Sequence, residues 1–237
     1  MGGIRSRIGY EVREARRRRA RHSAGPLVFL HIGKTGGTAI KNALRPCGYR
    51  SPYAIDLRRH DTTMMDVPAG TPFFFAIRDP IDRFASGFNS RQRRGAPRLN
   101  LPWSDDEAIA FARFSSANEL AEAIGTPEAE HAMHSINHVR ASYWHWFKDE
   151  DTFLSREGDI FGILRQAELT ADFEELATRL GLAGRAVLPT DVRHAHRDPG
   201  LLDRSLSALA VENLTQWYAR DFDFIRLCTD VHARLTA

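Results

Sequence analysis

One segment, residues 27 to 38, constrains the fold of this chain more than any other. Its first six residues form an apolar run of strand length, interrupted by His31 alone, and the run stops at Gly33. Gly36 and Gly37 permit a tight turn, and a helical pattern of apolar residues follows them. A glycine turn between a buried strand and a helix directs several backbone N–H groups to one point. Because the helix dipole and Lys34 add positive charge there, the sequence predicts an anionic nucleotide as the ligand.

The lysine of this loop differs in position from the lysine of a Walker A loop. A Walker A loop reads G-x-x-x-x-G-K-[ST], with its lysine after the last glycine. Lys34 instead follows Gly33 and precedes the paired glycines, so the loop is shorter and the lysine lies at its entrance. A plain glycine-rich turn with a solvated lysine is the alternative interpretation.

A second strand-to-helix unit follows at residues 73 to 88. Five apolar residues form the strand, and Arg78 stands at its carboxyl end. Asp79 is a favourable N-cap, and Pro80 suits the first helical position. Ser86 lies on the same helix, so Arg78 and Ser86 are expected to converge on a second anion near the strand ends.

Arg83 belongs to the same expected helix, four residues after Asp79 and one after Asp82. Ion pairs between neighbouring positions are common on helix surfaces. The sequence therefore predicts that Arg83 pairs with one of these carboxylates and holds the helix start. Contact with the ligand is the alternative.

Taken together, the two units resemble the sulfotransferases that use 3′-phosphoadenosine 5′-phosphosulfate (PAPS), in the Golgi-type carbohydrate (family 2-like) branch and its bacterial soluble members. The first family motif, roughly P-K-T-G-G-T, is matched from residue 33 to 38, with glycine in place of proline. The second, R-D-P-x-x-R-x-x-S, begins 45 residues later at Arg78. The resemblance implies that Arg78 and Ser86 hold the 3′-phosphate. It implies that the 5′-phosphosulfate is cradled by Lys34, Thr35, Gly36, Gly37 and Thr38.

Fainter matches extend the resemblance over roughly residues 27 to 225. Residues 168 to 173 resemble the family's E-x-L-x-x-D-F stretch, and residues 218 to 222 its Y-x-x-D-[FY] signature. Apolar strands alternate with helices along the chain, and this order predicts an α/β, P-loop-like three-layer fold with a central parallel β-sheet flanked by helices. The expected strands are 27–32, 53–57, 73–77 and 160–165.

The resemblance also implies the chemistry. Sulfuryl transfer, like phosphoryl transfer, is an in-line displacement in which the protein positions groups and neutralises charge. Lys34 is expected to stabilise negative charge on the leaving phosphate. His60 lies where the related enzymes place a catalytic histidine, and it is expected to deprotonate the acceptor, a hydroxyl of a carbohydrate or related small molecule, because histidine titrates near neutral pH. An ordinary exposed loop histidine is the alternative. The product would be adenosine 3′,5′-bisphosphate, and no metal is expected.

Four further histidines are weaker candidates for the site. His31, beside the loop, is expected to bond to backbone and fix the turn. A long helix is predicted from Thr126 to Trp146, and it would bring three histidines to one face. That face is a candidate acceptor groove, formed by His131, His134 and His138 with Tyr143, Trp144 and Trp146, and ordinary packing and solvation of these side chains is the alternative interpretation. A zinc site there is a less favoured alternative, because no cysteine or acidic pair completes it.

Residues 189 to 200 form a polar, turn-rich stretch that contains two arginines and two histidines. The family often closes a late loop over the nucleotide, so Arg193 and Arg197 are candidates for a cofactor clamp. An ordinary surface loop is the alternative that the poor motif match favours.

Charge is unevenly spread along the chain. Residues 1 to 26 carry eight arginines and two glutamates, a net charge of +6, whereas the whole chain carries +3. A run of arginines repels itself and usually stays mobile. We expect a flexible basic tail over 1–26 and a single sulfotransferase-like domain over 27–237. The tail lacks interleaved aromatics, so no nucleic-acid partner is expected, and peripheral membrane contact through it stays open.

Composition bears on location and redox chemistry. No apolar run approaches the roughly 18 residues that a membrane span requires, and a soluble cytoplasmic protein is expected. Cys47 and Cys228 are too few for a disulfide scaffold and are expected to be buried free thiols.

Two other classes of function stay open. A P-loop-type small-molecule kinase or other nucleotide phosphate-binding protein would also use a loop, a lysine and an arginine, and it should bind ATP with magnesium. A non-catalytic nucleotide or nucleic-acid binder would depend on the arginine-rich tail. The sequence predicts neither the identity of the acceptor nor the oligomeric state.

Overall fold

The computed structural model describes residues 22–97, 99–190 and 205–236. Within these residues, four strands form one parallel sheet in the order β2-β1-β3-β4. The strands are β1 (Gly25–Leu30), β2 (Tyr53–Leu57), β3 (Phe73–Ile77) and β4 (Ile160–Arg165). The chain runs from β1 outward to β2 and then returns past β1 to β3. The strand order therefore reverses between β1 and β3, and ligands of open α/β sheets bind outside the carboxyl ends of the strands at such a point.

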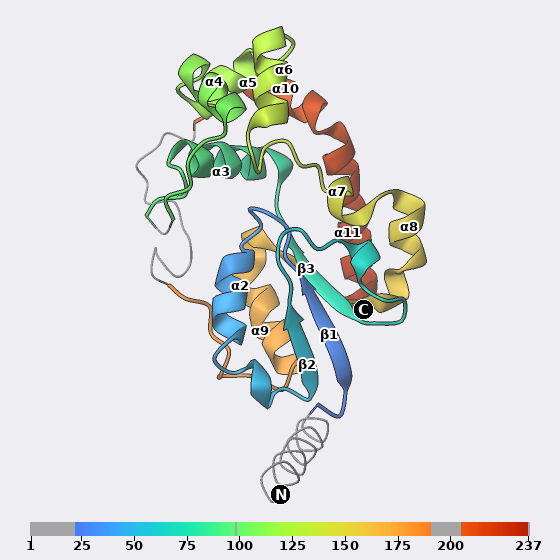
Figure 1. Ribbon diagram of the computed structural model, residues 1–237. Helices are drawn as coiled ribbons and strands as arrows, with labels where there is room; N and C mark the ends of the chain where they lie inside the picture. The colour runs from blue at the N-terminus through green and yellow to red at the C-terminus, as the bar shows by residue number, and fades with distance from the viewer. Residues whose placement is uncertain (1–21, 98, 191–204, 237) are drawn as a thin grey trace, which may run out of the picture.

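Helices cover both faces of the sheet, which confirms the predicted three-layer α/β arrangement (Figure 1). One face packs against α2 (Gly37–Leu44) and α9 (Leu169–Arg179). The other packs against α7 (Trp144–Phe147), α8 (Glu150–Ser155) and α11 (Ala219–Thr236).

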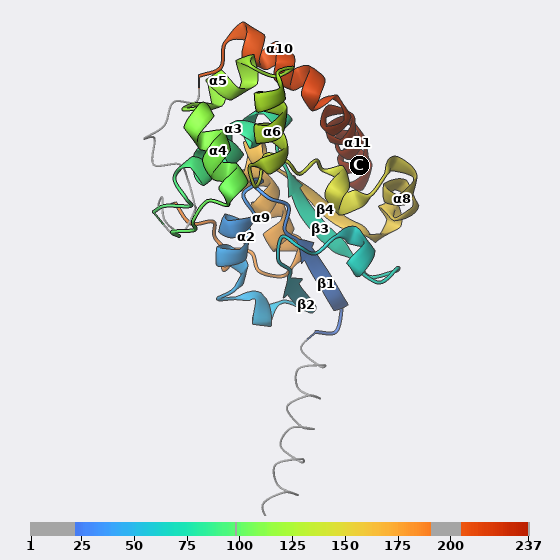
Figure 2. The same cartoon turned by 45° about the horizontal axis from the view of Figure 1, so that its top comes forward.

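A separate helical layer lies beyond the carboxyl ends of the strands (Figures 1 and 2). Its helices share a third apolar cluster of their own, built largely from alanine, leucine and phenylalanine. The layer consists of α3 (Pro80–Gln92), α4 (Asp105–Arg113), α5 (Ala117–Glu122), α6 (Pro127–Ser135) and α10 (Ala208–Trp217). Short 3-10 helices complete the described structure at Gly48–Arg50, Met64–Asp66, Glu157–Asp159 and Gln166–Glu168.

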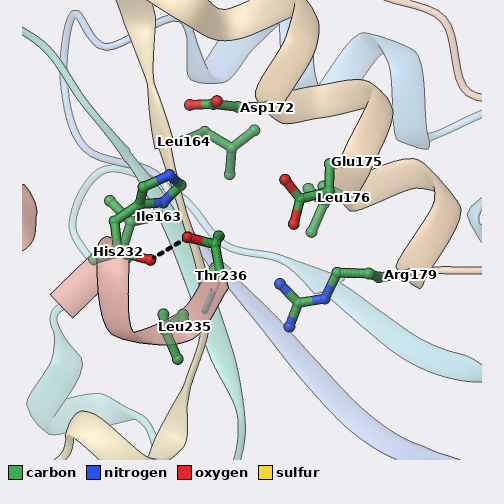
Figure 3. A pocket seen from close by; sticks show the side chains of 10 residues that line it. Ile163, Leu164, Asp172, Glu175, Leu176, Arg179, His232, Leu235 and Thr236 are labelled. Atoms are coloured by element: carbon green, nitrogen blue, oxygen red, sulfur yellow. Dashed lines mark hydrogen bonds between the residues drawn. The ribbon is translucent and has the colours of Figure 1, made fainter.

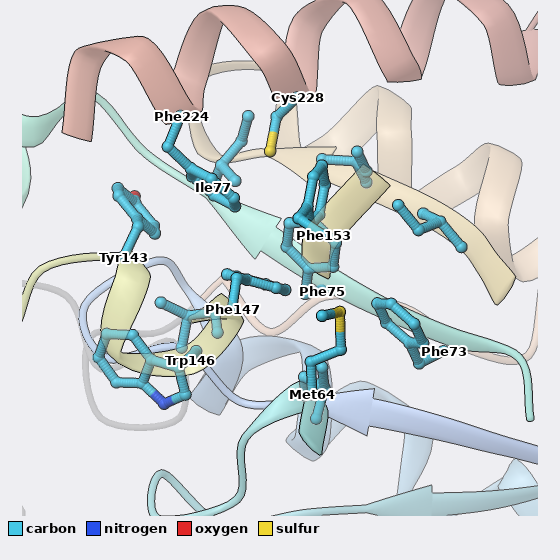
Figure 4. Packing of buried hydrophobic residues seen from close by; sticks show 14 of the residues in the cluster. Met64, Phe73, Phe75, Ile77, Tyr143, Trp146, Phe147, Phe153, Phe224 and Cys228 are labelled. Carbon is cyan, nitrogen blue, oxygen red and sulfur yellow. The ribbon is translucent and has the colours of Figure 1, made fainter. Parts of the chain in front are cut away.

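The central strand β3 is buried on both sides, which explains its continuous apolar sequence. Phe73 and Phe75 face the α11 side, and Phe74 faces the α2 side, since neighbouring strand residues point to opposite faces. On the α11 side, Phe75 lies 4.7 Å from Phe147 between ring centroids, and Phe147 lies 4.8 Å from Phe224 (Figure 4). This aromatic cluster ties the sheet to α7 and α11, and so fixes the segments that carry the candidate site.

Several sequence predictions are confirmed in detail. The bounds of β2, β3 and β4 agree with the expected ranges, whereas β1 lies two residues earlier than expected. Asp79 caps α3 by accepting hydrogen bonds from the backbone N–H groups of Ile81 and Asp82. Cys47 and Cys228 are buried free thiols, as predicted.

The predicted helix from Thr126 to Trp146 is wrong. The helix α6 ends at Ser135, and α7 is a separate single turn. The helix ends because Ile136 adopts an extended backbone with ψ of 118°. Two residues later His138 takes a left-handed backbone with φ of 70°, and its N–H donates to the side chain of Asn137. Ile136 and Val139 are buried on either side of this turn, so apolar packing holds the chain away from a helical path.

Two sequence predictions concern residues that the structure does not describe. Arg193 and Arg197 lie outside the described residues, as does most of the basic segment 1–26. In the part of the chain that is described, no helix is long and apolar enough to cross a membrane. The cytoplasmic location and the single-domain organisation stay predictions.

Candidate functional site

The loop between β1 and α2 has the backbone that the sequence predicts for an anion cradle. Gly36 has a φ of 89°, and Lys34 also adopts a left-handed backbone with φ of 69°. A residue other than glycine rarely takes this conformation, and such strain concentrates at functional sites. Helix α2 begins at Gly37 with no side-chain cap and no acidic residue in its first turn. Its N-terminal N–H groups therefore form a positive end suited to an anion.

Side chains beneath the loop hold its shape. Thr35 is fully buried, and its hydroxyl donates to the carbonyl of Ile32 at 3.0 Å. Gly37 packs so closely on His31 that an added Cβ would lie 2.1 Å from the imidazole Cδ2. The buried Thr35 hydroxyl therefore stabilises the loop conformation through its bond to Ile32. Thr38, the second residue of α2, is half-buried.

Arg78 lies directly beside this loop. Leu30 pairs with Phe75 in the sheet, so Gly33 and Arg78 each stand three residues past the same point. Arg78 is half-buried, and its guanidinium Nη1 donates to the carbonyl of Lys34 at 3.4 Å. The two expected anion-binding segments thus meet at the reversal point of the sheet. Ser86 lies farther along α3 and is half-buried.

The predicted pairing of Arg83 with Asp79 or Asp82 is wrong. Arg83 is only 2% exposed, and its Nε donates to the carbonyl of Gly33 at 3.0 Å. Its Nη2 donates to the carbonyl of Ala141 at 2.6 Å. The Asp79 carboxylate already accepts hydrogen bonds from the backbone N–H groups at the start of α3. The long side chain of Arg83 instead extends into the protein interior, where several acceptors surround its guanidinium, as a buried charge requires.

Asp221 and Tyr143 complete the surroundings of Arg83, a role that the sequence indicated for neither of them. Asp221, at the start of α11, lies 3.7 Å from the Arg83 guanidinium and is 1% exposed. It accepts hydrogen bonds from the Ser142 hydroxyl and from the backbone N–H of Tyr143. Desolvation raises the pKa of Asp221, and the Ser142 hydrogen bond and the Arg83 charge oppose that rise. The Y-x-x-D-[FY] match contains Asp221, and the expected acceptor groove contained Tyr143, but nothing in the sequence placed either residue beside Arg83.

His60 reaches the loop from the segment after β2. Its Nδ1 donates to the carbonyl of His31 at 3.1 Å, and the two rings lie 3.8 Å apart between centroids. Because a carbonyl oxygen only accepts, Nδ1 carries the proton and Nε2 carries the lone pair. The indole Nε1–H of Trp146 donates to the His60 carbonyl at 2.8 Å, and Lys41 Nζ donates to the carbonyl of Arg58 at 2.8 Å. These bonds fix the segment that carries the imidazole.

Desolvation and nearby positive charge favour the neutral form of this imidazole. The residue as a whole is exposed, but one face of the ring packs on His31. Desolvation is the largest influence and lowers the pKa of His60 below its ordinary value. The hydrogen bond to His31 opposes this shift, and the charges of Lys41 and Lys34 add to it. A neutral ring with an accepting Nε2 is the form that a general base requires.

His138 lies beside His60 instead of on the face of α6, so the predicted three-histidine face is wrong. The His138 and His60 rings are 5.9 Å apart between centroids, and His138 Nδ1 lies 3.4 Å from the position of a Cβ on Gly33. Gly87 of α3 faces the His138 backbone, where an added Cβ would lie 2.9 Å from the carbonyl oxygen. Desolvation, followed by the charge of Lys34, lowers the pKa of His138 to about 3.

The remaining parts of the predicted acceptor groove are dispersed. His131 and His134 are exposed on α6, where His131 faces Asp106 at 4.0 Å and His134 packs on Trp217. Tyr143 and Trp146 belong to the buried core. Among the described residues, no group of three or more histidine, cysteine or acidic side chains could hold a metal ion.

A separate groove of mixed polar and apolar lining lies at the edge of the sheet, along β4 between α9 and α11 (Figure 3). Asp172 accepts hydrogen bonds from the backbone N–H and the guanidinium of Arg165, and Arg179 donates to the carbonyl of Phe161 at 2.6 Å. These side chains cover backbone groups of an edge strand, a common protection against unwanted strand pairing. None of the predicted site residues lines this groove.

Comparison of the chain with protein-family models, with curated proteins and with solved structures found no match.

Proposed function

We propose that this chain is a PAPS-dependent sulfotransferase that moves a sulfuryl group to a hydroxyl of a carbohydrate or related small acceptor. The observation that carries the proposal is the meeting of the two anion-binding segments. Arg78 follows β3, Lys34 follows β1, and the guanidinium of the first donates to the carbonyl of the second. A ligand with anionic groups at both ends of one nucleoside could engage both segments.

The loop suits the 5′ end of that ligand. Left-handed backbone at Lys34 and Gly36 turns the chain sharply, and the uncapped start of α2 supplies backbone donors. We assign backbone N–H groups of Thr35, Gly36, Gly37 and Thr38 to the 5′-phosphosulfate. Because the Thr35 hydroxyl already donates to Ile32, its side chain is not included. Arg78, together with Ser86, is assigned to the 3′-phosphate.

The reaction follows from these assignments. The acceptor oxygen forms a bond to sulfur while the bond from sulfur to the phosphate oxygen breaks, and the acceptor proton passes to Nε2 of His60. The bridging oxygen leaves with the electron pair as part of adenosine 3′,5′-bisphosphate. Lys34 stabilises this developing charge, and single electrostatic donors of this kind contribute roughly 10²–10³-fold to rate. No step requires a metal ion.

Ligand binding tests the proposal directly. Isothermal titration with adenosine 3′,5′-bisphosphate should give saturable micromolar binding to the wild type, and the Arg78→Ala variant should bind at least about tenfold more weakly, the loss of about 1.4 kcal/mol. Magnesium-dependent binding of ATP in place of the bisphosphate would favour the small-molecule kinase. Absence of any binding of the bisphosphate to the folded wild type would refute the sulfotransferase.

Turnover is tested by transfer of ³⁵S-sulfate from labelled PAPS to a panel of oligosaccharides and cell extracts. Lys34→Ala should lower the transfer rate by roughly 10²-fold with a smaller change in bisphosphate affinity, because Lys34 acts mainly on charge that develops in the transition state. An Arg59→Ala variant, on the exposed part of the same segment as His60, is the matched control and should transfer at the wild-type rate.

A further inference from the structure

The two anion-binding segments are joined by a continuous buried network. Arg83 donates to Gly33 of the loop and lies 3.7 Å from the Asp221 carboxylate. Asp221 accepts from the backbone N–H of Tyr143 at 3.0 Å. The Tyr143 hydroxyl in turn contacts Arg78, so the network runs from the loop after β1 to the residue after β3.

The contact between Tyr143 and Arg78 is two-sided. The phenol donates to the Arg78 carbonyl at 2.7 Å and accepts from the Arg78 backbone N–H at 2.9 Å. Both backbone groups of one residue are therefore held by one hydroxyl. Arg78 is the first residue after β3, whose pairing with β4 ends at Ile77 and Arg165. The tyrosine thus fixes the backbone at the point where the paired part of β3 ends.

The surroundings make this tyrosine rigid. Tyr143 is fully buried, its ring stacks on Phe224 at 5.1 Å, and the Arg83 guanidinium lies 4.8 Å from its centroid. Burial raises the pKa of the phenol beyond its ordinary value, so the hydroxyl keeps its proton and remains a donor. A fixed ring with a fixed hydroxyl gives Arg78 one backbone position relative to the loop.

We propose that Tyr143 is a positioning residue that sets the spacing between the two anion-binding segments, and so selects nucleosides phosphorylated at both the 3′ and 5′ positions over 5′-monophosphates. This inference rests on the proposed function. Asp221 and Arg83 hold the other end of the same network. The 3′-phosphate determines this selectivity, because the loop alone can bind the 5′-phosphate.

The experiment measures the ratio of affinities for adenosine 3′,5′-bisphosphate and adenosine 5′-monophosphate by titration calorimetry. Tyr143→Phe keeps the ring and removes only the hydroxyl, and the ratio should fall about tenfold, mainly through weaker bisphosphate binding. Tyr218→Phe is the matched control. Tyr218 is also buried and also donates to one backbone carbonyl, that of Val139 at 3.0 Å, but it does not contact Arg78. Its variant should keep the wild-type ratio within twofold.

A double variant separates positioning from general loosening of the structure. If Tyr143 acts through Arg78, then Tyr143→Phe should change the ratio less than twofold in an Arg78→Ala background. An unchanged ratio in Tyr143→Phe, or an equal fall in Tyr218→Phe, would overturn the inference while leaving the proposed function in place. Failure of the wild type to bind the bisphosphate would overturn both. Should circular dichroism show that Tyr143→Phe is unfolded, Asp221→Asn serves instead, with a fall of at least threefold expected and no fall as the contrary result.

Discussion

Arg83 shows how far the role of a single residue depends on its burial. Its spacing from Asp79 and Asp82 suggested a surface ion pair, a contact worth little in water. Buried, the same guanidinium donates to two backbone carbonyls and faces one carboxylate. Removing one partner of a buried charge is costly, commonly about 3–5 kcal/mol, because the other charge stays behind without compensation. These buried contacts make Arg83 important for the structure. The sequence motif around Arg83 did not indicate that its side chain is buried.

His138 provides a prediction about pH and stability. In the folded protein its pKa is lowered to about 3, chiefly by desolvation, whereas in the unfolded chain it titrates near 6.5. Between these values the unfolded state binds one more proton, so His138 makes the folded protein less stable as the pH falls below about 6.5. The slope approaches about 1.4 kcal/mol per pH unit.

The measurement is urea unfolding at pH 7, 6, 5 and 4 for the wild type and His138→Asn. Asparagine tolerates the left-handed backbone at this position but does not titrate. Relative to the variant, the wild type should lose stability steadily as the solution is acidified. Two parallel curves of free energy against pH would show that His138 is not desolvated as described.

At the scale of elements, β1, the loop after it and α2 pack tightly on one another around Gly37. A Cβ added at Gly37 would overlap with the imidazole of His31. That imidazole packs against the rings of His60 and Phe29, so it has little room to move. Glycine is required here for close approach, and at Gly36 for its φ of 89°. The paired glycines of the motif thus have two different physical roles.

Gly37→Ala should therefore destabilise the protein by about 1–3 kcal/mol, the usual cost of overpacking. It should also weaken binding of adenosine 3′,5′-bisphosphate, because His31 carries the carbonyl that orients His60 and lies under the loop. Gly158→Ala is the control, since an added Cβ there meets nothing within 4 Å. Thermal unfolding of both variants provides the comparison, and equal melting temperatures would contradict the close-packing argument.

In the whole molecule, the candidate site lies where the sheet meets the helical layer. The chain leaves the sheet after β3, builds α3 to α6, and returns through the segment that carries His138 and Tyr143. Residues 22 and 24 are joined to the segment before β2: His22 Nδ1 donates to the Ser51 carbonyl, and Ala24 N–H to that of Pro52. The sheet thus begins inside the basic segment 1–26, because its last two residues, Gly25 and Pro26, belong to β1 and pair with β2.

Deletion of residues 1–21 should leave the affinity for adenosine 3′,5′-bisphosphate within twofold of the full chain, since the proposed ligand contacts begin at Lys34. A deletion extended to residue 26 would remove the first part of β1 and its pairing with β2, and should destabilise the fold. Calorimetric titration of both truncated chains makes the comparison. Complete loss of nucleotide affinity on removing 1–21 would favour the binder that depends on the arginine-rich tail.

Local features were readable from the chain because they depend on neighbours in sequence. The apolar run of residues 73 to 77 defined β3, Asp79 and Pro80 defined the start of α3, and the glycines defined the turn before α2. The α/β class follows from their alternation. The identity of the ligand, the base His60 and the acceptor stay predictions.

The contacts that assemble the candidate site arise between distant segments, and no local pattern encodes them. Arg83 meets a residue 50 positions away, Tyr143 meets Arg78 across 65 positions, and Asp221 meets Tyr143 across 78. His138 moved from an expected helix face to the side of His60 because burial of its apolar neighbours outweighed helical periodicity. Charge burial and close packing depend on residues that are distant in sequence and adjacent in the fold, so only the tertiary structure determines these partners.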